Sequence, residues 1–311
     1  MTKQTHLPVP TTPATTTQAF PPDFHRKYKN RLPVFVKGHA ELRAACTTVE
    51  GLRCLFSATG GLPNEGSGGA RVNVMKALDG ENFLDDERYT EPVSISVEDF
   101  IGHVKDTNGS ERGRMYYRST LPESLKALLA ASDILDTICP TTSDATEKQA
   151  FVHRSFSLAR LWVSTTGCVT PLHYDKCHGL LVQLYGRKRF IVFPRDDAGS
   201  LYLHNGITGP THASRVRAVD KIFENAARLH RGDIAQEETI PLQQQIDNFL
   251  DSYPKVAKTT PYVIELDPGD ILYTPPGYLH EVASLSGSVS VTIPWDMCPD
   301  ELDDRPAWMA F

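Results

Sequence analysis

Residues 165–176 read TTGCVTPLHYDK and contain the pair His173-x-Asp175. On a β-strand, residues two apart project from the same face of the sheet, so both side chains can point into the interior of a β-barrel. An imidazole and a carboxylate on one face are two of the three ligands in the facial triad of non-haem iron(II) sites. The pair alone is weak evidence, because a buried histidine hydrogen-bonded to a nearby acid has the same spacing.

A second stretch, residues 266–280, reads LDPGDILYTPPGYLH and offers a third ligand. Its PGD tripeptide is typical of a turn, residues 271–274 of a short strand, and residues 275–277 of a rigid corner. The corner places His280 at the mouth of the next strand, which is expected over residues 288–294. A second imidazole completes a set of two histidines and one carboxylate.

The chain around these motifs is rich in short apolar runs separated by turn residues. This pattern of short runs is typical of a β-sandwich or barrel, and it differs from the pattern of alternating strands and helices. Between the runs, residues 205–260 are polar and partly helical, which indicates an insertion between barrel strands. The runs are 158–165, 179–185, 188–194, 262–266, 270–275 and 288–294.

Composition narrows the class of protein. The 311 residues include 32 Lys+Arg and 38 Asp+Glu, which gives a net charge of −6. This charge argues against a protein that binds nucleic acid through its overall positive charge. The six cysteines form no CxxC pair, so zinc-finger and thioredoxin-type motifs are absent from the sequence. There is no apolar signal segment and no membrane-length apolar run. We expect a soluble protein of the cytoplasm and/or nucleus.

Residues 151–296 resemble the JmjC-type (cupin-8) branch of the iron(II)- and 2-oxoglutarate-dependent oxygenases, and in particular its small hydroxylases. Three runs match in order: LWVSTTGCVTPLHYD, GLLVQLYGRKRFIVFP and LDPGDILYTPPGYLHEV. The resemblance implies a mainly β fold with α elaborations, built on a double-stranded β-helix (cupin or jelly-roll) core. The catalytic core is expected over 151–311, with the insertion at about 205–260. An N-terminal α/β elaboration is expected over 23–150, after a disordered Thr/Pro-rich tail over 1–22.

The resemblance implies that His173, Asp175 and His280 bind iron. It also assigns Lys188 to the distal carboxylate of 2-oxoglutarate. The residues support this second role independently, because Lys188 shares a strand face with the apolar Phe190 and Val192 and so needs an anion there. Residues 281–295 contain no Lys or Arg that could replace it.

Two hydroxyl groups complete the co-substrate site that the resemblance implies. Thr170 and Tyr116 match side chains that support the same carboxylate, and the neighbouring Tyr117 is the alternative to Tyr116. The chain departs from the family at Thr292-Ile-Pro-Trp295, where relatives commonly read Asn-Phe-Trp or Asn-Ile-Phe-Trp. Thr292 and Trp295 are therefore candidate substrate contacts.

Other histidines and cysteines have simpler interpretations. Cys177 is expected as a small inward-facing thiol and His178 as an outward-facing residue, and neither is taken as a metal ligand. The histidines of the insertion are expected to be exposed to solvent. They are His204, His212 and His230.

The resemblance implies hydroxylation of a C–H bond of a protein side chain, with Fe(II), 2-oxoglutarate and O2 as cofactors and with release of succinate and CO2. The alternatives are a small-molecule biosynthetic oxygenase, then a tRNA-base hydroxylase or an N-methyl demethylase. An open groove beside the iron would favour a peptide, and a pocket closed by the insertion would favour a small molecule. We expect no membrane partner. A monomer is favoured, because the sequence after Trp295 is shorter than the helices through which relatives dimerise.

Overall fold

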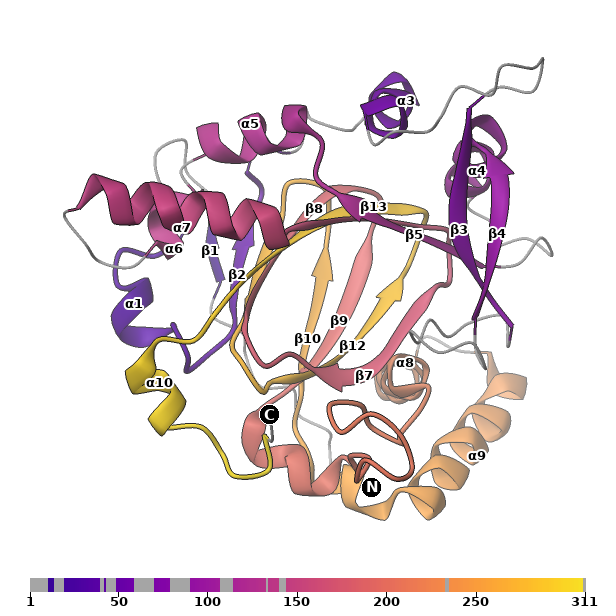
Figure 1. Cartoon of the computed structure of the whole chain (residues 1–311). Helices are drawn as coiled ribbons and strands as arrows, with labels where there is room; N and C mark the ends of the chain where they lie inside the picture. The colour runs from indigo at the N-terminus through magenta and orange to yellow at the C-terminus, as the bar shows by residue number, and fades with distance from the viewer. Residues whose placement is uncertain are drawn as a thin grey trace.

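The computed structural model describes residues 11–13, 20–39, 42, 49–58, 70–78, 90–106, 114–132, 134–139, 144–232 and 235–309. Two β-sheets face each other, and helices cover their outer surfaces (Figure 1). The larger sheet has nine strands in the order β1-β2-β11-β8-β13-β6-β5-β3-β4, and the smaller has four in the order β10-β9-β12-β7. Every strand pair is antiparallel except β1 with β2.

The strands before the core are β1 (Thr11–Pro13), β2 (Val34–Lys37), β3 (Arg71–Ala77), β4 (Thr90–Ser96) and β5 (Met115–Thr120). The core strands are β6 (Arg160–Ser164), β7 (Val169–Tyr174), β8 (His178–Tyr185), β9 (Lys188–Phe193), β10 (Tyr262–Leu266), β11 (Ile271–Thr274), β12 (Leu279–Ser284) and β13 (Ser288–Trp295). Along the chain the core strands alternate between the two sheets, except that β9 and β10, on either side of the insertion, are neighbours in the smaller sheet; this is the winding of a double-stranded β-helix. The predicted fold class is confirmed.

The helices before the core are α1 (Phe24–Lys27), α3 (Val49–Ala58), α4 (Val97–Lys105), α5 (Glu123–Ala131), α6 (Ile134–Ile138) and α7 (Ala145–Leu158). Two helices lie between core strands β9 and β10, namely α8 (Val219–Arg231) and α9 (Gln236–Ser252), and α10 (Pro299–Asp303) follows the last core strand. There are 3-10 segments at Arg195–Ser200 and Pro254–Lys258. Among the described residues, no helix combines the length and the apolar character that a membrane crossing requires.

Segments before residue 150 extend the core sheet on both sides. Strand β2 pairs with β11 at one side, and β5 pairs with β6 at the other. Within the stretch expected as a disordered tail, the structure describes residues 11–13 as β1, parallel to β2, and residues 20–22, where Phe20 is buried in the core. Residues 1–10 and 14–19 lie outside the described residues, so the rest of that expectation is not addressed.

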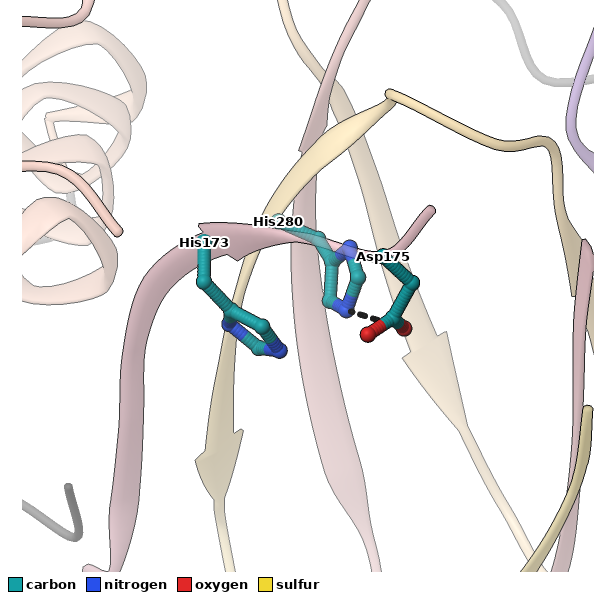
Figure 2. Close-up of side chains that lie close together, drawn as sticks. All are labelled: His173, Asp175 and His280. Carbon is teal, nitrogen blue, oxygen red and sulfur yellow. Dashed lines mark ion pairs between the residues drawn. The ribbon is translucent and has the colours of Figure 1, made fainter. Parts of the chain in front are cut away.

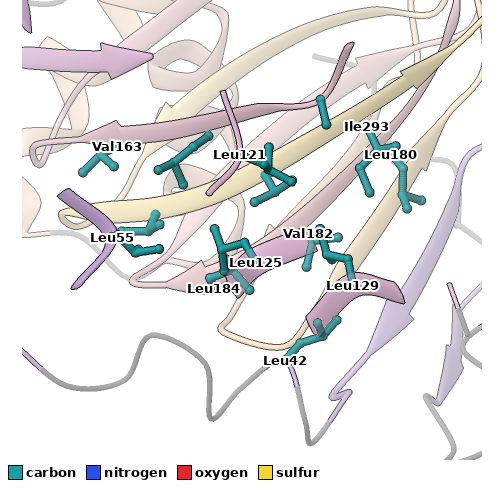
Figure 3. Packing of buried hydrophobic residues seen from close by; sticks show 14 of the residues in the cluster. Leu42, Leu55, Leu121, Leu125, Leu129, Val163, Leu180, Val182, Leu184 and Ile293 are labelled. Atoms are coloured by element: carbon teal, nitrogen blue, oxygen red, sulfur yellow. The ribbon is translucent and has the colours of Figure 1, made fainter. Parts of the chain in front are cut away.

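The outer face of the larger sheet packs against helices. Leu180, Val182 and Leu184 of β8 project to this face and meet Leu125 and Leu129 of α5 (Figure 3). Leu181, between them, projects to the opposite face and packs against the smaller sheet. Both faces of β8 are therefore buried, which explains why this segment reads as an uninterrupted apolar run.

The insertion covers the outer face of the smaller sheet. Helix α8 places apolar side chains at helical spacing on one side, and its Phe223 lies against Phe193 of β9, with ring centroids 5.9 Å apart. Phe249 of α9 joins the same cluster. The two helices lie side by side, and α8 contacts β9 and β12 (Figure 1).

A buried polar network joins the beginning and the end of the fold. His178 Nδ1 accepts from the Tyr273 hydroxyl at 2.9 Å, and His178 Nε2 donates to Glu301 at 3.0 Å. Lys29 pairs with the same carboxylate at 3.3 Å. His178 faces away from the cavity, as expected, but it is fully buried there, because the outer face of β8 is also covered and the imidazole finds polar partners.

Candidate metal centre

Three potential metal ligands meet where β7 and β12 lie side by side. His173 is on β7, Asp175 follows directly after it, and His280 is on β12 opposite His173. One ligand atom from each residue lies within 4.8 Å of the other two. His280 Nε2 is 3.8 Å from Asp175 Oδ2, and the two imidazole centroids are 4.5 Å apart (Figure 2).

Backbone carbonyl groups orient both imidazoles. His173 Nδ1 lies 2.8 Å from the carbonyl oxygen of Pro171, and His280 Nδ1 lies 3.1 Å from that of Tyr278. A carbonyl can only accept, so each Nδ1 carries the hydrogen and each Nε2 keeps its lone pair. Two such nitrogens with one carboxylate are the donor set that iron(II) takes in a facial triad, so these residues fit the ion.

The electrostatics of His280 also suit a ligand. Burial and the neighbouring His173 lower the pKa of His280 to about 4, against the opposing influence of Asp175. The imidazole is therefore neutral near pH 7, and a histidine must be neutral to bind a metal.

Lys188, the first residue of β9, is buried beside this cluster with 1% of its surface exposed. Its Nζ donates to the Tyr116 hydroxyl at 3.1 Å and to Ser290 Oγ at 3.0 Å. Both partners are neutral, and within the described part of the chain no carboxylate pairs with Lys188. Tyr117 points to the other face of β5, where its ring packs against Phe56 and Phe100.

One cavity of about 660 Å3 holds these groups together. It is lined by the three candidate ligands, by Lys188, by Thr170 and Tyr116, and by Thr292. Its volume lies in the range of sites for small ligands.

Trp295 lies outside this cavity. Its indole stacks on His178 at 5.0 Å and on Tyr273 at 5.8 Å, in the core behind the larger sheet. Thr292 and Trp295 are three residues apart on β13, so their side chains project from opposite faces. The structure thus brings Thr292 to the candidate site and leaves Trp295 away from it.

The profile of the cupin-like domain family matches residues 24–301. This chain belongs to the cupin-like family of JmjC-domain proteins. It is 34% identical over 137 residues to the "Jumonji C domain-containing protein 5" of Drosophila melanogaster, which is 44% of this chain and 27% of that protein. It is 28% identical over 134 residues to the "JmjC domain-containing protein F" of Dictyostelium discoideum, covering 42% and 25%. These alignments span about a quarter of each relative's length.

A different JmjC relative matches over a greater length. The "tRNA wybutosine-synthesizing protein 5" of Gallus gallus is 25% identical over 283 residues, which is 89% of this chain and 74% of that protein. The similarity therefore extends through the N-terminal elaboration as well as the core.

Several cavity residues of this JmjC chain were not predicted from the sequence. His212 and His230 are exposed to solvent, as expected, whereas His204 is half-buried; His204 and His212 also line the cavity, which was not expected. Trp162, which lines the cavity, and Ser290, which binds Lys188 behind it, were assigned no role. Ser290 could have been found, because it lies two residues before Thr292 and so shares its strand face. Cys177, expected as a small buried thiol, is half-buried and also lines the cavity.

Proposed function

We propose that this protein is an iron(II)- and 2-oxoglutarate-dependent oxygenase that hydroxylates a C–H bond and releases succinate and CO2. One observation carries the proposal. A buried lysine with no carboxylate partner in the described part of the chain opens into the same cavity as two histidines and an aspartate that fit iron. A buried cation needs an anion, and a dicarboxylate co-substrate supplies one.

Each residue of the site has a proposed task. His173, Asp175 and His280 hold iron(II), which supplies the oxidising chemistry together with 2-oxoglutarate and O2 when these are bound. Lys188, Tyr116 and Thr170 bind the distal carboxylate and orient the co-substrate. The apolar walls of the cavity limit the access of water to the reacting groups.

For the substrate, the sequence favours a protein side chain, and a small molecule is the alternative. One observation favours the alternative. Residues 204–217 contribute seven of the residues that line the cavity, so the start of the insertion forms a roof over the candidate metal centre. Backbone hydrogen bonds from Ser214 to Leu172 and from Tyr174 to His212 hold this roof against β7. A small molecule fits such a covered space better than an extended peptide.

The relatives' names suggest two further outcomes. One relative is named a tRNA wybutosine-synthesizing protein and another a "Lysine-specific demethylase JMJ30". Hydroxylation of a tRNA base and removal of an N-methyl group thus stay as alternatives that the experiment must be able to register.

The test is succinate formation by the full chain with Fe(II), 2-oxoglutarate and O2, followed by untargeted mass spectrometry of cell extract treated with the protein. We expect slow succinate release without substrate and a product heavier by one oxygen atom. Loss of a methylene unit would instead indicate demethylation. Asp175→Ala should abolish both signals while the far-UV circular dichroism stays unchanged. Full turnover by Asp175→Ala would contradict the proposal.

A further inference from the structure

The cavity carries more positive than negative charge. Of the cavity-lining residues that the structure describes, four are cationic and only Asp175 carries a carboxylate. The cationic residues are Arg118, Arg160, Lys188 and Arg217. The proposed function uses Asp175 for iron and Lys188 for 2-oxoglutarate, and it leaves the arginines without a task.

Arg160 and Arg217 are held in place by groups that do not neutralise them. Arg160, at the start of β6, donates through Nη1 to the carbonyl oxygens of Ser157 and Ala159 at 3.0 and 2.9 Å. Arg217, in the loop before α8, donates through Nη1 to the carbonyl oxygens of Ser214 and Val216. The carbonyl groups hold both guanidinium groups in place, but they are neutral and do not compensate for the positive charge. In the described ranges neither arginine has a carboxylate within 4.0 Å, although Arg217 is close enough to the buried Glu281 to oppose the rise that burial causes in the pKa of that carboxyl.

Several arginines elsewhere in the described fold have acidic partners, although Arg71 and Arg195 hydrogen-bond to neutral groups of Ser94 and Asn30. Arg189 lies within 4 Å of Asp220, Glu224 and Glu265. Arg228 pairs with Glu238 at 2.9 Å. A guanidinium that is partly removed from water gains most from a carboxylate or phosphate, which it can bind with two parallel hydrogen bonds. Two cavity arginines without such a partner therefore point to an anion that arrives with the substrate.

The cavity also offers apolar surface next to these charges. Met75 and Leu158 line it and remain 37% and 38% exposed. Trp162 lines it as well. Its ring lies 5.5 Å from that of Tyr116, and its Nε1 donates to Thr292 at 2.8 Å. Such a wall suits an apolar ligand body.

We propose that the substrate is a small organic anion with an apolar body, whose carboxylate or phosphate group is bound by Arg160 and Arg217. The two arginines come from different walls of the cavity. Arg160 lies on the larger sheet opposite Thr292, whereas Arg217 follows the roof segment that pairs with β7 of the smaller sheet. This inference rests on the proposed function and specifies the substrate class of the same site.

The test is isothermal titration calorimetry on the full chain, loaded with Mn(II) and saturating 2-oxoglutarate so that the metal site and Lys188 are already occupied. Four probes share one chain length: octanoate, octyl phosphate, octanamide and octylamine. We expect one or both anions to bind at least about 10-fold more tightly than octanamide, and octylamine to bind most weakly. The comparison of octanoate with octyl phosphate identifies the acidic group.

Arg160→Gln and Arg217→Gln should each weaken binding of the preferred anion by about 10-fold, because each removes a charge-assisted hydrogen-bond donor. Arg228→Gln, which removes a charge outside the cavity, should leave it unchanged. Equal binding of octanoate, octyl phosphate and octanamide by the unmodified protein would overturn the inference, whether or not the variants fold. Failure of 2-oxoglutarate to bind with Mn(II) would overturn the proposed function instead, so the two failures are distinguishable.

Discussion

A charged lysine that is almost wholly buried needs polar or anionic partners that compensate for its lost contact with water. Lys188 donates to two hydroxyl groups, and its remaining hydrogen-bonding capacity serves the proposed co-substrate. Lys188→Met should raise the KM for 2-oxoglutarate by about 10- to 100-fold, since a charge-assisted hydrogen bond contributes about 1.5–3 kcal/mol. Succinate formation against 2-oxoglutarate concentration measures this. Arg187→Met, on the exposed face next to it, is the control and should leave KM unchanged. A normal KM in Lys188→Met would remove the lysine from the site.

The adjacent tyrosines of β5 allow a sharper test. The Tyr116 hydroxyl contacts Lys188, whereas the Tyr117 ring packs in the core on the opposite face. Tyr116→Phe should raise the KM for 2-oxoglutarate by about 10-fold, because it removes a hydroxyl that bonds the charged Lys188 and the proposed carboxylate. Tyr117→Phe should leave KM unchanged. The same assay measures both variants, and an effect confined to Tyr117→Phe would reverse their assignment.

The candidate ligand set could be read from the sequence because the rules involved are local. Alternation along a strand places His173 and Asp175 together, and the Pro-Pro-Gly corner positions His280. The same alternation shows why Trp295 lies elsewhere, because it is an odd number of residues from Thr292. The prediction for Trp295 followed the family pattern and overlooked this parity.

At the scale of elements, two hairpin turns pack tip to tip against a helix end. A Cβ atom at Gly287, between β12 and β13, would overlap the carbonyl oxygen of Val104 in α4. Gly186, between β8 and β9, has a φ of +62° and packs directly on Gly287. The close approach of backbone to backbone therefore requires glycine at both turns.

Gly287→Ala should lower the free energy of unfolding by about 2–3 kcal/mol, because the helix end must move away. Gly102→Ala is the matched change within α4. Its Cβ would meet nothing within 4 Å, so alanine should raise the stability by up to about 1 kcal/mol through its higher helix propensity. Urea unfolding measures both. A destabilisation of equal size in the two variants would contradict the packing described here.

The position of the roof over the cavity could not be predicted from the sequence. The sequence indicates an insertion at 205–260, but its first loop is joined to β7 through main-chain hydrogen bonds. Such bonds involve no particular side chains and leave no pattern in the sequence. His204 and His212 could therefore not be assigned to the cavity, although the strands beneath them were predicted from their alternation and turns.

At the scale of the whole molecule, Glu301 near the end of the described chain is bound to Lys29 near its beginning. Burial alone would raise the pKa of Glu301, but hydrogen bonds from His178 and from the Cys298 N–H, together with Lys29, lower it from 4.5 to about 2. The folded state thus holds the charged carboxylate more strongly than the unfolded chain does. The resulting stabilisation, on the order of 3 kcal/mol, is complete above about pH 4.5 and is lost as the pH falls towards 2.

Glu301→Gln removes this dependence while keeping the shape of the side chain. The difference in unfolding free energy between the unmodified protein and Glu301→Gln should be largest near pH 7 and should shrink as the pH falls below about 4.5. Urea titrations at a series of pH values measure it. Glu238→Gln, in an exposed ion pair with Arg228, is the control and should show little effect at any pH. A constant difference across the series would contradict the assigned pKa.

The attachment of the roof to β7 also constrains how molecules enter and leave. Main-chain hydrogen bonds flank His173 on both sides, through Leu172 and Tyr174, so the roof cannot swing away without pulling on a metal-ligand strand. Substrate and product are then expected to enter and leave past the exposed Met75 and Leu158. This entrance is formed by β3 and the end of α7, and a crosslink there would trap product where a crosslink on the roof would not.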